Sequence, residues 1–170
     1  MQEDLGREYY LTGSGHKPEP AFQEIYDKYH VFLGEEALRV VRASGSNVIL
    51  EWLAELRAGR KTAFLDEKQI VWEQEKVLHV GECEIEYLKA PIELANSADR
   101  EFRIALDDVR SRASASGLDD LRRDRFQLEH EEMGQLGLGN YVESLGVLAG
   151  IDFAELCDGA RKFLEATEAM

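Results

Sequence analysis

The stretch HEEMG, residues 130–134, joins a histidine and a glutamate in a segment with helical periodicity. A zinc-peptidase helix requires His-Glu-x-x-His, because residues four apart lie on one helical face and both imidazoles can then bind one metal ion. Gly134 occupies the position of the second histidine, and no other histidine has this spacing relative to His130. We therefore interpret the stretch as a solvated charged run with a surface His130, and we predict no catalytic residue and no metal ligand here.

Two other metal chemistries have partial sequence signals. A di-iron helical bundle requires two Glu-x-x-His motifs, and the chain offers only DKYH, residues 27–30. Carboxylates three apart in EIYD, residues 24–27, and EHEE, residues 129–132, resemble the helical carboxylates of magnesium-dependent nucleotide hydrolases. Nucleotide hydrolysis is therefore kept as an alternative, below a noncatalytic role.

Phosphate-loop and cysteine chemistry are not indicated. GQLGLGN, residues 134–140, lacks the Lys-Ser/Thr end of a P-loop, and its glycines are typical of a helix end. Cys83 and Cys157 are too few and too far apart for a zinc knuckle or a disulfide framework, so we expect small buried thiols. The sequence predicts no cofactor.

The charge balance limits the partners. Acidic residues number 34 and basic residues 20, which gives a formal net charge of −14. Such a chain is repelled by nucleic-acid phosphates and anionic lipid, so we expect neither nucleic acid nor membrane as a partner. The first residues show no basic and apolar leader pattern, and no apolar run reaches the length of a membrane span, so we expect a cytoplasmic location.

The elements that would position these residues are mostly helices, because apolar residues recur three and four apart along most of the chain. The segments with this period are 3–15, 21–32, 35–44, 46–60, 61–77, 96–116, 118–136, 137–150 and 151–170. Helix breaks are expected near Gly59 and at Gly117, and Asp152 should cap the last helix. Trp52, Trp72, Tyr26 and Phe102 are expected in the core.

Residues 77–94 differ, because alternating apolar residues surround Gly81 and Pro91 disfavours a helix. We predict a small β-hairpin or extended arm there. The predicted fold is therefore mostly α, a single domain over residues 1–170 with about seven to eight helices and one hairpin.

The last helix carries an apolar stripe at helical spacing, formed by Phe153, Leu156, Ala160, Phe163 and Leu164. The stripe either closes the core of the domain or packs against a partner. In the second case a homodimer through this helix is expected.

The order of segments in the second half resembles the helical N-terminal region of M3-type zinc metallopeptidases, the relatives of oligoendopeptidase and thimet oligopeptidase. The segments are APIELANSADREFRIALDDVR, residues 90–110, and LGLGNYVESLGVLAGIDFAELCDGARKFLEATE, residues 136–168; residues 7–38 match more weakly. The matching positions are core and turn residues, namely Ala95, Asn96, Gly139, Asn140, Tyr141, Ile151, Asp152 and Phe153. The family's His-Glu-x-x-His helix lies beyond this region, so the resemblance transfers no catalytic residue, metal ligand or cofactor.

The resemblance implies a noncatalytic module that forms one wall of the channel around a zinc site carried elsewhere. Its expected partners are a zinc-peptidase catalytic domain and peptide substrates. The alternative is a stand-alone helical protein-interaction domain.

Overall fold

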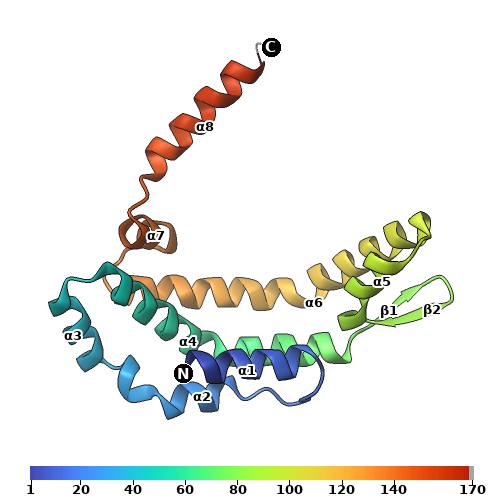
Figure 1. Ribbon diagram of the computed structural model, residues 1–170, viewed down its shortest axis with the longest axis horizontal. Coiled ribbons are helices and arrows are strands. Elements are labelled where there is room, and N and C mark those ends of the chain that lie inside the picture. The colour runs from blue at the N-terminus through green and yellow to red at the C-terminus, as the bar shows by residue number, and fades with distance from the viewer. Residues whose placement is uncertain (169–170) are drawn as a thin grey trace. The chain divides into compact units, whose positions relative to one another are not determined.

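A computed structural model describes residues 1–168 and shows a mostly α-helical chain with one two-stranded hairpin (Figure 1), which confirms the predicted fold class. The helices are α1 Gln2–Gly13, α2 Phe22–Lys28, α3 Glu35–Ser44, α4 Asn47–Glu75, α5 Ala90–Asn96, α6 Arg100–Gln135, α7 Tyr141–Ala149 and α8 Phe153–Glu168, with short 3-10 turns η1 His30–Leu33 and η2 Tyr87–Lys89. The strands are β1 Val77–Val80 and β2 Cys83–Glu86. The last two residues of the helix predicted over 151–170 lie outside the described part.

The chain divides into two compact units. Unit 1 contains residues 1–30 and 60–127, and unit 2 contains residues 31–59 and 128–170. The long helices α4 and α6 contribute residues to both units. The expectation of a single domain over residues 1–170 stays a prediction.

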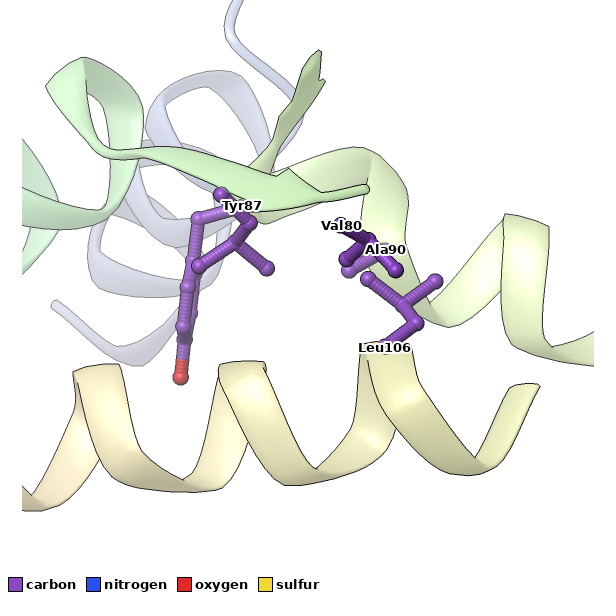
Figure 2. Packing of buried hydrophobic residues seen from close by; sticks show 5 residues of the cluster. Val80, Tyr87, Ala90 and Leu106 are labelled. Atoms are coloured by element: carbon purple, nitrogen blue, oxygen red, sulfur yellow. The ribbon is translucent and has the colours of Figure 1, made fainter. Parts of the chain in front are cut away.

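The hairpin of unit 1 closes an apolar cluster against α6. Its strands are antiparallel, with Val80 paired with Cys83, and Gly81 has a φ of 61°. A glycine with positive φ at the first of two loop residues is what a tight hairpin turn of this hand requires. Val80 and Ala90 lie beside Leu106 of α6, and the Tyr87 ring points toward another part of the same helix (Figure 2). Leu78 completes the cluster.

An ionic network joins α1, α4 and α6 within unit 1. Arg125 Nη1 donates to Oδ1 of Asp66 at 2.6 Å, and the Tyr9 hydroxyl donates to Oδ2 at 3.3 Å. Asp66 is 7% exposed. A buried carboxylate requires such donors, because transfer of an uncompensated charge out of water is costly. The three helices are therefore held in a defined register by one aspartate.

Unit 2 has its own buried residues and its own ion pair. The buried apolar side chains are Leu33, Leu38, Leu53, Ala54, Ala58, Met133 and Leu136. Arg57 of α4 donates through Nε to Oε1 of Glu132 at 2.6 Å and through Nη1 to Glu35 at 2.9 Å. Arg42 Nη2 also donates to the backbone carbonyl of Leu136.

Both expected helix breaks are wrong, and a helix forms at Pro91 although this residue was expected to disfavour one. Helix α4 passes through Gly59, where the cost of about 1 kcal/mol for an interior glycine is outweighed by its buried neighbours such as Ala58. Helix α6 passes through Gly117, and a Cβ at this position would lie 2.4 Å from the indole of Trp72, so the glycine allows close packing and does not end the helix. Pro91 lies in the first turn of α5, where its missing N–H is tolerated.

Some of the expected burial is also wrong. Tyr26 is buried as predicted and Trp72 and Phe102 are partly buried, but Trp52 is 55% exposed, so its ring lies outside the core. Cys83 and Cys157 are exposed free thiols rather than buried ones. Helical or alternating spacing identifies a face of an element but not whether a neighbour covers it.

Candidate interaction surface

Helix α7 has a complete capping box at its start. The Asn140 side chain accepts from the backbone N of Glu143 at 2.9 Å, and the Glu143 carboxylate accepts from the backbone N of Asn140 at 2.9 Å. Two donors that a helix start leaves without partners are thereby satisfied. The helical period of residues 137–150 predicted a short helix in this segment, and the helix begins at Tyr141.

The turn from α7 to α8 is also fixed by local interactions. Gly150 ends α7 with a φ of 67°, and the Ile151 backbone N donates to the Gly146 carbonyl at 3.1 Å. The Phe153 ring would lie 3.7 Å from a Cβ at Gly146. Asp152 caps α8 as predicted, because its Oδ1 accepts from the backbone N atoms of residues 154 and 155 at 2.9 and 3.0 Å.

Helix α8 leaves most of its apolar stripe in contact with solvent. The exposed fractions are 60% for Leu156, 67% for Phe163 and 59% for Leu164, and Ile151 before the helix is 43% exposed. Phe153 is partly buried. The stripe therefore does not close the core of the described part of the chain. Full burial of one such Leu or Phe side chain contributes about 1.5–3 kcal/mol of favourable free energy. A protein that covered the stripe would therefore gain several kcal/mol of binding free energy.

Helix α8 is amphipathic, with one apolar side and one charged side. Asp158, Arg161, Lys162 and Glu165 fall on the side opposite to Leu156, Ala160, Phe163 and Leu164 at 3.6 residues per turn. Arg161 pairs with Asp158 at 3.2 Å on that side. A hollow of about 590 Å³ follows the apolar side and is lined by Ile151, Asp152, Glu155, Leu156, Gly159, Ala160 and Phe163. Amphipathic helices of this kind pack their apolar face against another protein surface.

The HEEMG run, residues 130–134, lies near the end of α6. His130 is partly buried on α6, and Glu132 of the same run is only 1% exposed, so the prediction of a fully solvated run is wrong. Runs of charged residues usually face solvent, but Glu132 is buried because it pairs with Arg57 of α4. Within residues 1–168 no group of three or more His, Cys, Asp or Glu side chains is placed to bind a metal ion.

Two of the carboxylates expected to bind magnesium, Asp27 and Glu132, pair with arginines. Asp27 lies 3.2 Å from Arg60 Nη2 and Glu132 lies 2.6 Å from Arg57 Nε. Each carboxylate is therefore neutralised by an arginine of α4, which opposes the binding of a metal cation at the same oxygen. These contacts do not favour the nucleotide-hydrolase alternative.

The other histidines also have local partners. His16 Nδ1 lies 2.8 Å from the Ser14 hydroxyl, and His30 Nδ1 lies 2.7 Å from the Asp27 carbonyl. His79 lies 3.6 Å from Glu84 across the hairpin. Each of the three imidazoles therefore has a polar partner close by in the sequence.

Two arginine–carboxylate pairs could not be found from sequence. Arg57 with Glu132 and Arg125 with Asp66 are separated by 75 and 59 residues. Charged residues three or four apart in 119–125 can pair within the helix, as Arg122 does with Asp119. The pairs between α4 and α6 become visible only in the structure, where these helices lie side by side.

Comparison with protein-family models, with curated proteins and with solved structures finds no match. No helix within residues 1–168 is long and apolar enough to span a membrane.

Proposed function

We propose that this chain is a noncatalytic helical module that docks through the apolar face of α8 onto the zinc-bearing part of an M3-like metallopeptidase, where it shapes the access of peptide substrates. The observation that carries the proposal is the exposure of Leu156, Phe163 and Leu164 on one side of an amphipathic helix. Apolar patches of this kind mark protein–protein interaction sites. The peptidase assignment rests on the sequence resemblance of residues 90–110 and 136–168, and the cytoplasmic location belongs to the same proposal.

The alternative is a stand-alone helical interaction domain, which the same exposed face supports. The two differ in the identity of the partner. In the first case the partner contains a His-Glu-x-x-His helix and zinc, and in the second it contains neither.

Affinity capture from the source cells tests the proposal. The bait is the tagged chain, and bound proteins are identified by mass spectrometry and assayed for zinc. We expect enrichment of a protein with His-Glu-x-x-His and about one zinc per complex. Phe163→Glu should abolish the enrichment because it places a charge on the apolar face, whereas Lys162→Glu on the opposite side should not. Enrichment of a partner without that motif favours the stand-alone alternative.

A further inference from the structure

Unit 1 contains a hollow of about 560 Å³ beside the second half of α4. Its apolar walls are Pro20, Phe64, Val71 and Trp72, and its charged lining residues are Glu19, Glu67, Lys68 and Glu75. Pockets of about 300–1,000 Å³ with apolar walls and a few polar groups are typical of ligand sites. None of these residues belongs to α8, so the hollow is separate from the surface on which the proposed function rests.

The Trp72 wall of the hollow is fixed by its neighbours. The Tyr87 ring meets the indole edge-on, with centroids 5.1 Å apart. Gly117 of α6 approaches the same indole so closely that a Cβ at this position would lie 2.4 Å from it. A ring that is already ordered loses little conformational freedom when a ligand packs on it, so it favours binding.

The residues that line the hollow carry three carboxylates and one ammonium group. A second ammonium, that of Lys76, lies over the Trp72 ring at 5.8 Å from its centroid, so carboxylates still outnumber cations. Glu67 accepts from the backbone N of Gln23 at 2.9 Å, and the Lys68 ammonium lies over the Phe64 ring at 5.3 Å. In the described part of the chain, neither Glu19 nor Glu75 forms an ion pair. These two carboxylates are therefore available to a cation.

We propose that this hollow binds a cationic peptide segment of another molecule, with an aromatic or aliphatic side chain against Trp72 and a lysine or arginine beside Glu75 or Glu19. The apolar walls recognise the anchor side chain, and the carboxylates select the flanking charge. The net charge of −14 attracts such a segment at long range and repels phosphorylated or acidic ligands.

The test is a fluorescence titration of the whole chain with Trp52→Phe, which leaves Trp72 as the only tryptophan. Trp52 is 55% exposed, so its replacement should leave the fold intact. The probe is an acetylated and amidated Lys-Phe-Leu-Lys peptide, compared with Glu-Phe-Leu-Glu and Lys-Ala-Ala-Lys. We expect a saturable change in Trp72 emission with the first peptide, and binding weaker by about tenfold for the other two.

Two matched variants locate the binding. Glu75→Gln at the hollow should weaken the Lys-Phe-Leu-Lys peptide by about threefold or more, and this loss should shrink at high salt. Glu82→Gln removes the same charge at the exposed hairpin turn and should leave the affinity unchanged. Equal affinity for all three peptides, equal effects of the two variants, or no saturable change in emission would each overturn the proposal.

Discussion

Arg57 donates through Nε to Oε1 of Glu132 at 2.6 Å, and the glutamate side chain is only 1% exposed. Arg57→Ala removes the guanidinium from an almost fully buried carboxylate, so it should lower the free energy of unfolding by about 3–5 kcal/mol. Glu132→Ala leaves Arg57 paired with Glu35, so it should cost less. Urea denaturation measures this. Arg39→Ala provides the control, because its pair with Glu36 is exposed and should contribute less than about 1 kcal/mol. Equal small effects at Arg57 and Arg39 would show that the buried pair does not stabilise unit 2.

The buried Tyr26 should make stability depend on alkaline pH. Burial raises the pKa of its phenol, and the Asp66 carboxylate raises the pKa further. We base the prediction on Tyr26, which is 8% exposed, rather than on Tyr9, whose pKa is also raised but which is 46% exposed. A phenol whose pKa is higher in the folded state contributes stability below its unfolded pKa of about 10, and this stability is lost as pH rises through the folded pKa.

The measurement compares wild type with Tyr26→Phe in urea between neutral and alkaline pH. The stability difference between them should be constant at neutral pH. Above about pH 10 the wild type should lose up to about 1.4 kcal/mol per pH unit relative to the variant. Tyr10→Phe is the control, because Tyr10 is 69% exposed. A constant difference between wild type and Tyr26→Phe across the whole range would contradict the raised pKa.

Gly117 should respond to substitution opposite to an ordinary helical glycine. Gly117→Ala places a methyl group 2.4 Å from the Trp72 indole, so it should destabilise the protein by about 1–3 kcal/mol. Gly6→Ala in α1 meets nothing within 4 Å and should stabilise the protein by about 0.4–1 kcal/mol. Thermal unfolding of the two variants decides the matter, and a stabilising Gly117→Ala would show that the indole is not held there.

The purified chain should contain no stoichiometric zinc and should not hydrolyse peptides, because Gly134 stands where a second zinc ligand would be needed. Elemental analysis and a mixed-peptide cleavage assay measure both properties. One zinc per chain, together with cleavage that is lost in His130→Ala, would show that residues 130–134 do form a metal site.

Features that depend only on residues close together in the sequence could be predicted from it. The turn at Gly81 and the Asp152 cap each depend on residues at most four apart, so the sequence indicates them directly. Breaks were expected at Gly59 and Gly117, and no helix at Pro91, because each of these residues is disfavoured in a helix interior. Gly117 lies inside α6, where the lack of a side chain leaves room for the Trp72 indole. Trp72 is 45 positions away in the sequence, so local signals do not reveal this contact.

The burial of individual side chains and the hollow in unit 1 were less predictable, because both depend on residues far apart in the sequence. Trp52 and Trp72 have similar helical surroundings in the sequence, but only Trp72 meets a second ring and a close glycine. The apolar stripe of α8 was visible from spacing alone, whereas its exposure depends on what the rest of the chain covers. Spacing therefore identifies candidate surfaces, and packing decides which of them remain available.

Sedimentation of the isolated chain over a wide range of concentrations tests directly whether the apolar face of α8 is a docking surface. With no partner on Leu156, Phe163 and Leu164, the wild type should form a reversible dimer as concentration rises, because exposed apolar patches associate. Phe163→Glu should remain monomeric throughout, and Lys162→Glu should behave as the wild type does. A wild-type monomer at every concentration, or a dimer that Phe163→Glu does not weaken, would contradict the claim.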